Sequence, residues 1–104
     1  MKLSTEQIDA RLRAVPGWKF EDKSLLRQYA FASFPDAIAF VTRLAFDAQA
    51  ADHHPDLTIH FKRVTVRWST HDQGGVTEKD FEGVRQADAV ARQMDPTHAS
   101  RPAD

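Results

Sequence analysis

Three stretches of the chain place apolar residues at the spacing of an amphipathic helix. The first begins at Ser4 and Gln7, which have the spacing of a capping box. The second has Pro35 in its first turn and should end near Asp52, because the residue before the next proline is disfavoured in a helix. The third begins after Thr77. The apolar residues expected on the buried faces are Ile8, Leu12 and Val15, then Phe34, Ile38, Val41, Leu44, Ala45 and Ala48, and finally Phe81, Val84, Ala87, Ala91 and Met94.

Alternation of apolar and polar residues predicts four strands. Two follow the first helix, on either side of a polar turn at 21–23, and two follow the second helix, over 57–62 and 64–69. Short connections between paired strands favour antiparallel pairing. The order α-β-β-α-β-β-α therefore predicts an α+β domain with a four-stranded antiparallel sheet and three helices on one face. We expect this single domain to span 1–94 and the remaining residues, 95–104, to form a flexible C-terminal tail.

Composition narrows the classes of function. The 104 residues suffice for one small domain. A net charge of −1, from 14 basic and 15 acidic residues without a basic run, gives no reason to expect a nucleic-acid partner. Cysteine is absent, so disulfides and thiolate catalysis are excluded, and no apolar run approaches the roughly 20 residues of a membrane helix. We expect a cytoplasmic protein without a membrane partner.

Candidate chemistry gathers around three histidines. His53 and His54 lie between the second helix and the third strand, and His71 follows the fourth strand. Antiparallel pairing of these two strands would bring the start of one close to the end of the other. Because the unperturbed pKa of histidine is about 6.5, the side chain can give or take a proton near neutral pH. The pattern predicts one pocket for proton transfer.

Each candidate also has a purely structural interpretation. His53 could interact with the dipole at a helix C-terminus, His54 could be a polar loop residue, and His71 could belong to a turn. Asp80 could serve only the first turn of the third helix, three residues after Thr77. Three histidines and a carboxylate could alternatively hold zinc, although their spacing is poor for it. His60 should face the other side of the sheet, His98 falls in the tail, and Trp18 and Trp68 are expected in the core or at a subunit interface.

A set of residues across the second half of the chain resembles the signature of the pterin-4a-carbinolamine dehydratases. It comprises Asp52-His53-His54-Pro55, Phe61, Ser69-Thr70-His71, Gly74-Gly75 and Thr77-Glu78-Lys79-Asp80. The resemblance implies the same fold and a homodimer or homotetramer. It also implies removal of water from 4a-hydroxytetrahydropterin to give quinonoid dihydropterin, which recycles the cofactor of aromatic amino acid hydroxylases. The resemblance further implies that no metal and no other cofactor is needed.

The resemblance also implies roles for individual residues. It makes His53, His54 and His71 the histidines on which dehydration depends, and Asp80 the acidic residue of the site. We assign proton transfer to His53 and His71, and mainly pterin binding to His54. The residues expected to line the pterin pocket, besides the three histidines, are Asp52, Ser69, Thr70 and Asp72.

The chain departs from the animal members of the family at two positions. Gln49 replaces a glutamate, and Leu57 replaces an aromatic residue. Since Gln49 lies one helical turn before His53, a glutamate there could stabilise a charged imidazole, whereas the amide can only form a hydrogen bond. Two alternatives to catalysis remain open. The chain could be a non-catalytic protein-dimerisation module, such as a partner of a transcription factor, or a pterin-binding protein of molybdopterin metabolism.

Overall fold

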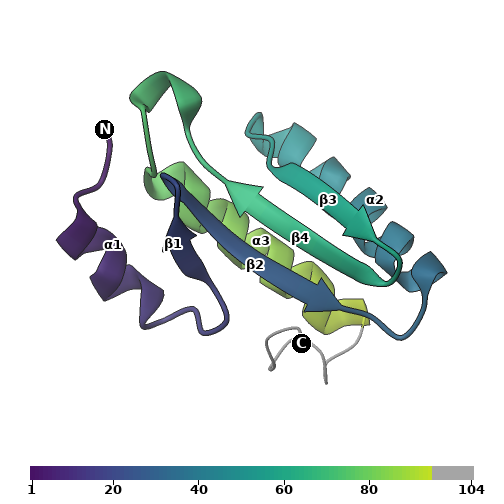
Figure 1. Cartoon of the computed structure of the whole chain (residues 1–104). Coiled ribbons are helices and arrows are strands. Elements are labelled where there is room, and N and C mark those ends of the chain that lie inside the picture. Colours follow the sequence, from purple (N-terminus) through teal and green to yellow (C-terminus); the bar gives the residue numbers. More distant parts are fainter. Residues whose placement is uncertain (95–104) are drawn as a thin grey trace.

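Helices and strands alternate along residues 1–94, which are the part of the chain that the computed structural model describes (Figure 1). The predicted tail lies outside the described residues. The elements are α1 (Thr5–Leu12), β1 (Lys19–Glu21), β2 (Ser24–Ala30), α2 (Phe34–Ala51), β3 (Asp56–His60), β4 (Arg63–Trp68), the short 3-10 helix η1 (His71–Gln73) and α3 (Glu78–Met94).

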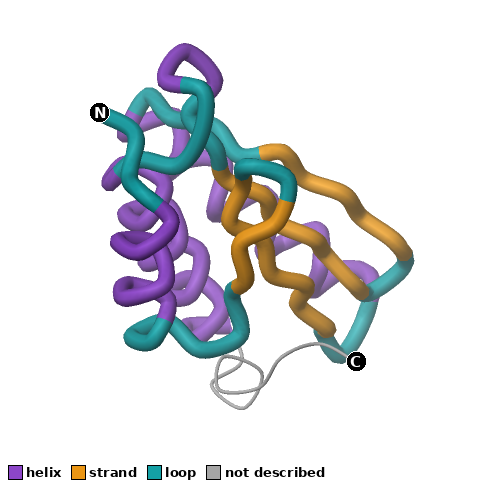
Figure 2. The backbone as a smooth tube through the Cα atoms, turned by 60° about the vertical axis from the view of Figure 1, so that its left-hand side comes forward, coloured by secondary structure: helices purple, strands orange, loops and turns teal. Residues whose placement is uncertain are grey.

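The four strands form one antiparallel sheet in the order β1-β2-β4-β3. The three α-helices lie on one side of this sheet, and the two layers are seen from the side in Figure 2. The α+β fold predicted from the sequence is thus confirmed. Strand β4 is central and its core-facing residues Val64, Val66 and Trp68 are fully buried, so residues at its ends are held on a rigid element.

Local chemistry sets the helix ends that matter for the site. The predicted capping box is present, because the Ser4 side chain accepts from the Gln7 N–H and the Gln7 side chain accepts from the Ser4 N–H. Helix α2 begins with Ser33 as N-cap and ends at Asp52, whose φ of +53° is left-handed. This reversal turns the chain out of the helix immediately before His53 and His54.

The buried face of α2 was predicted wrongly in part. Leu44 and Ala48 are buried as expected, but Phe34 and Ile38 are 48% and 38% exposed. The helix is apolar on more than one side, so helical spacing alone fits two faces. The residues that enter the core are Ala37, Phe40, Leu44 and Ala48, whereas Phe34, Ile38, Ala45 and Phe46 face outward. The stripe predicted for α3 is confirmed at Phe81, Val84, Ala87 and Ala91.

A buried carboxylate on α3 holds the β1–β2 hairpin. Asp88 accepts hydrogen bonds from the Trp18 indole at 3.1 Å, from the Arg27 guanidinium at 2.9 Å and from the Tyr29 hydroxyl. Burial, followed by the negative charge and the hydrogen bond of Asp88, raises the pKa of Tyr29 far above its usual value, although Arg27 and Arg92 oppose the shift. Tyr29 therefore stays protonated in the folded state.

This arrangement predicts alkaline destabilisation through Tyr29. Above pH 10 the tyrosine ionises in the unfolded chain but not in the folded one. The contribution of Tyr29 to the free energy of unfolding, which is fully present below pH 10, is therefore lost as the pH rises. The free-energy advantage of the wild type over Tyr29→Phe, about 1.5–3 kcal/mol for a hydrogen bond to a charged group, should shrink by about 1.4 kcal/mol per pH unit above 10. Urea unfolding of both proteins between pH 8 and 11 measures this, and a constant difference would contradict it.

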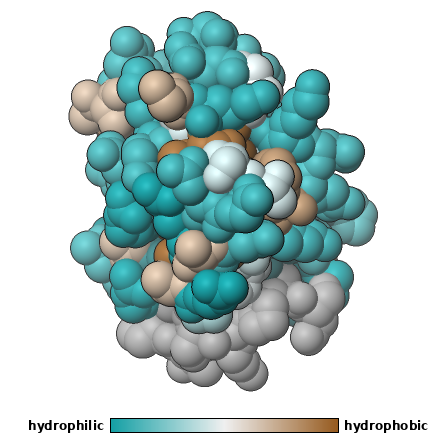
Figure 3. Space-filling view, turned by 90° about the vertical axis from the view of Figure 1, so that its left-hand side faces the viewer, coloured by the Kyte–Doolittle hydropathy of each residue, from teal (hydrophilic) through white to brown (hydrophobic). Residues whose placement is uncertain are grey.

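The face of the molecule that carries α1 is mainly hydrophilic, with apolar surface confined to small patches (Figure 3). None of the helices in residues 1–94 combines the length and the apolar character needed to cross a membrane.

Candidate active site

The candidate residues lie at one end of the β3–β4 hairpin. Asp56, the first residue of β3, pairs with Arg67 near the end of β4. The chain that enters β3 carries His53 and His54, and the chain that leaves β4 carries Ser69, Thr70 and His71. Residues about 17 positions apart in the sequence are therefore brought to the same end of the β3–β4 hairpin, as antiparallel pairing predicts.

His53 is held on two sides. Its Nε2 lies 2.6 Å from Oδ1 of Asp80, and its ring stacks on the indole of Trp68 with centroids 5.6 Å apart and planes 19° from parallel. The side chain is only 15% exposed. An imidazole with this little freedom has a fixed orientation, which is what a proton-transfer group requires.

Asp80 is the centre of the hydrogen-bond network and is fully buried. Besides His53 at Oδ1, its Oδ2 accepts from the Thr70 hydroxyl at 2.8 Å and from the Thr77 N–H at 2.9 Å. The hydroxyls of Thr70 and Thr77 are also 2.8 Å apart. The two interpretations of Asp80 from sequence are therefore compatible, because one oxygen completes the first turn of α3 while the other meets His53.

His54 has a different partner. Its Nε2 lies 2.8 Å from Oε1 of Gln49, on the last turn of α2. The expectation that Gln49 would serve His53 is wrong, because the left-handed Asp52 ends the helix before the histidine pair and helical spacing no longer applies beyond it. Since the amide oxygen only accepts, the contact assigns a proton to Nε2 of His54.

The other predicted site residues are placed as follows. His71 is exposed and begins η1, which closes at Gly74 with a φ of +75°. Among the described residues no hydrogen bond joins the His71 side chain to His53, His54 or Asp80, so convergence of the three imidazoles on one ligand remains a prediction. Asp52 is the C-cap of α2, and Ser69 is half-buried.

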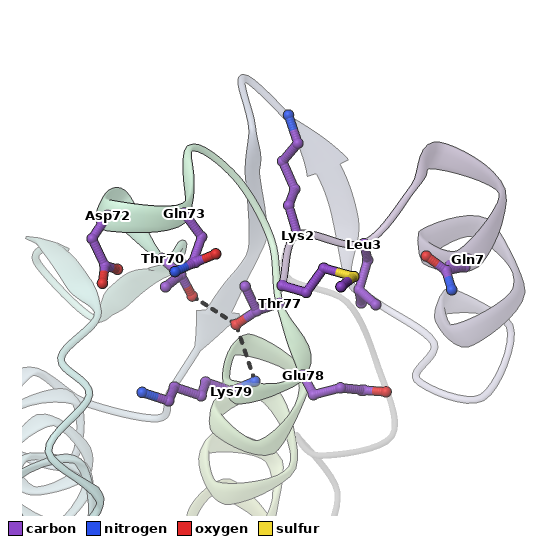
Figure 4. A pocket seen from close by; sticks show the side chains of 10 residues that line it. Lys2, Leu3, Gln7, Thr70, Asp72, Gln73, Thr77, Glu78 and Lys79 are labelled. Carbon is purple, nitrogen blue, oxygen red and sulfur yellow. Dashed lines mark hydrogen bonds between the residues drawn. The ribbon is translucent and has the colours of Figure 1, made fainter.

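Thr70 and Asp72 line a cavity of about 410 Å³ between the N-terminal segment, η1 and the start of α3. Figure 4 shows Asp72, Gln73 and Lys79 on one side of it, Lys2 and Leu3 on another, and Thr70 and Thr77 joined by their hydrogen bond. A smaller cavity of about 90 Å³ lies beside His53 and Trp68, against α3. His53 and Asp72 therefore border different cavities.

Sequence reasoning missed the contact of Trp68 with His53. Trp68 was expected only in the core or at an interface, and it is indeed fully buried. A period-two pattern identifies which face of a strand is buried, but not which side chain will pack on which. Within residues 1–94, no three His, Asp or Glu side chains come together as ligands of one metal ion.

Comparison with known proteins relates the chain to one protein family. The family model described as pterin 4 alpha carbinolamine dehydratase matches residues 1–90. A protein from Chloroflexus aurantiacus, provisionally named pterin-4-alpha-carbinolamine dehydratase, is 49% identical over 80 residues, which are 77% of this chain and 86% of that protein. One from Sulfolobus acidocaldarius, with the same provisional name, is 39% identical over 90 residues, covering 86% and 99% of the two chains.

Solved structures give the same result. A crystal structure of a transcriptional coactivator/pterin dehydratase from Brucella melitensis superimposes with a TM-score of 0.84 at 33% identity, covering 88% of this chain and 99% of that one. A pterin dehydratase-like protein identified as a RuBisCO assembly factor in the alpha-carboxysome shares the fold, with a TM-score of 0.62 at 23% identity. Since the family model spans most of the chain and relatives exceed 30% identity over nearly their full length, the chain belongs to the pterin 4 alpha carbinolamine dehydratase family.

Proposed function

We propose that this protein dehydrates 4a-hydroxytetrahydropterin to quinonoid dihydropterin by acid–base catalysis from histidine side chains. The observation that carries the proposal is the contact of the half-buried His53 with the fully buried Asp80, with Nε2 and Oδ1 2.6 Å apart, at the end of the hairpin that also carries His71. A carboxylate that orients one nitrogen of an imidazole leaves the other nitrogen for proton transfer.

The contacts of Asp80 suggest which nitrogen of His53 acts. Asp80 already accepts two hydrogen bonds at Oδ2, so the proton in its contact with His53 is assigned to Nε2 of the imidazole. Nδ1 then carries a lone pair and can act as a base. The exposed His71 can exchange protons with solvent, which suits a general acid.

The proposed reaction conserves atoms and charge. His71 donates a proton to the 4a-hydroxyl, the C4a–O bond breaks, and water leaves. Nδ1 of His53 accepts the proton from N5, and the electron pair of that N–H bond forms the C4a=N5 double bond. Solvent then returns a proton to His71 and removes one from His53. The proposed steps are two proton transfers and the cleavage of the C4a–O bond, and none of them requires a metal or an additional cofactor.

The direct test is to generate the carbinolamine with a pterin-dependent hydroxylase and to follow its decay with and without this protein. We expect faster decay, with an enhancement limited by the uncatalysed reaction. Decay at the same rate in both samples would remove the proposed function. The same assay with different pterin side chains tests the finer proposal that the substrate is the 4a-carbinolamine of tetrahydrobiopterin. We also propose that the protein serves an aromatic amino acid hydroxylase in the cytoplasm.

A prediction about His54 follows from its contact with Gln49. If His54 mainly binds the pterin, Gln49→Ala removes the group that orients it and should raise KM several-fold, while kcat stays within about twofold of the wild type. Steady-state kinetics measure both parameters. A fall in kcat at unchanged KM would instead assign His54 to the proton transfers.

We further propose that the protein is a homo-oligomer. The outward face of α2 exposes Phe34, Ile38 and Phe46, the last of them 75% exposed, and apolar surface of this kind supports association.

The same surface supports the second candidate function, a protein-association module. Sedimentation measures the mass in solution, and the carbinolamine assay separates the module from an enzyme.

A further inference from the structure

We propose that Trp68 is a positioning residue for His53, and that Gly83 on α3 is what allows Trp68 to occupy this place. The proposal rests on the proposed function for its activity readout only, because the orientation of His53 can also be measured without substrate.

The rings of His53 and Trp68 stack on each other. The imidazole of His53 and the indole of Trp68 are nearly parallel, 19° apart, at a centroid distance of 5.6 Å. The Nε2 of His53 is fixed by Asp80, but one hydrogen bond leaves the ring free to rotate about it. A flat aromatic surface beside the ring removes that freedom. The indole and the carboxylate together define the direction of Nδ1.

Trp68 approaches α3 closely at Gly83. A Cβ added at Gly83 would lie 2.5 Å from Cδ2 and Cε2 of Trp68 and 2.6 Å from Cε3. Cδ2 is bonded to three ring atoms, so this approach is to the face of the indole and a methyl group has no room there. Gly83 is therefore required by packing, despite the usual preference for alanine inside a helix.

Helix α3 carries both Asp80 and Gly83. Asp80 and Gly83 are three residues apart and so lie on the same side of the helix. The same face of α3 therefore carries the Asp80 carboxylate that contacts His53 and, at Gly83, the space that the Trp68 indole occupies. The small cavity of about 90 Å³ is bordered by His53, Trp68 and Gly83, among other residues.

The cost of this tryptophan supports a role beyond filling space. Its indole N–H is buried and has no hydrogen-bond partner among the described residues. Burying an unsatisfied donor is unfavourable, and an aliphatic side chain such as leucine would avoid it. What the indole adds is a broad aromatic surface beside the imidazole of His53.

The decisive variant is Gly83→Ala, studied with Trp68→Phe and the double variant. The added methyl should displace the indole, move the ring-proton NMR resonances of His53 away from their upfield, stacked position, and lower kcat by about tenfold to a hundredfold with KM changed less than threefold. The smaller phenylalanine ring should make room for the methyl, so the double variant should recover most of kcat and of the His53 signal.

Two further variants keep the result interpretable. Trp68→Leu removes the aromatic surface without crowding α3 and should shift the His53 resonances even if Gly83→Ala fails to fold. Trp18→Phe is the matched control, because this buried tryptophan bonds to Asp88 and packs on Tyr29, away from His53. It should leave the His53 signal and kcat unchanged.

The outcomes separate this proposal from the proposed function. If the wild type does not accelerate dehydration but Gly83→Ala and Trp68→Leu still move the His53 resonances, the function fails and the positioning role stands. If the wild type is active and both variants leave kcat and the His53 signal unchanged, the positioning role is wrong.

Discussion

Replacement of His53 by alanine is expected to lower kcat for carbinolamine dehydration by about 10²-fold or more, which is the usual contribution of a positioned general base. The fold should survive, because the side chain is at the edge of the core and the Asp80 carboxylate keeps its hydrogen bonds to Thr70 and Thr77. Stopped-flow measurement of carbinolamine decay at saturating substrate gives kcat directly.

The matched control is His60→Ala. His60 is an exposed histidine on β3, whose alternation places it on the face opposite to the helices, so its loss should leave kcat within about twofold of the wild type. Equal losses in the two variants would show a general effect of removing a histidine. A His53→Ala enzyme with the wild-type rate would contradict the assignment of the base.

Replacement of Asp80 by asparagine is expected to cost about 10²-fold in kcat through the tautomer of His53. Oδ2 of Asp80 accepts two hydrogen bonds, so the single amide oxygen of asparagine should take that place. The NH₂ group then faces Nε2 of His53, which must become an acceptor, and the ring proton moves to Nδ1. The nitrogen proposed as the base would no longer have a lone pair, a loss known to be severe when a buried carboxylate orients a catalytic histidine.

Two measurements separate this effect from misfolding. The ¹⁵N shifts of the His53 ring report the tautomer, and urea unfolding should show a loss of only about 1–2 kcal/mol, because the bonds to Thr70 and Thr77 persist. Asp88→Asn is the control, since Asp88 is also a buried carboxylate on α3 but has no contact with His53. An Asp80→Asn enzyme with an unchanged His53 tautomer and unchanged kcat would refute the role of the pair.

How far the sequence predicts the structure depends on whether the chemistry is local. The capping box at Ser4, the end of α2 at Asp52 and the alternation in β4 are determined by neighbouring residues, and all were confirmed. The face of α2 was not, because Phe34 and Ile38 have helical spacing that fits the core as well as the buried residues do. Periodicity identifies an apolar face without saying what covers it.

The site shows the same division. The pairing of β3 with β4 follows from short connections and brings His53 and His71 to one end of the sheet. The partners of the side chains do not follow from spacing. Gln49 contacts His54 because a left-handed residue intervenes, and Trp68 contacts His53 because Gly83, on helix α3, leaves room for the indole. Such contacts depend on tertiary packing, which no local pattern encodes.

We propose that His53, His54 and His71 surround one bound pterin. This placement can be tested by titrating the protein with a stable reduced pterin and following the histidine ring resonances in ¹H–¹⁵N NMR spectra. The resonances of all three histidines should change along one common saturation curve while those of His60 stay constant. Resonances of His71 that do not move, or that follow a different affinity from those of His53, would contradict it.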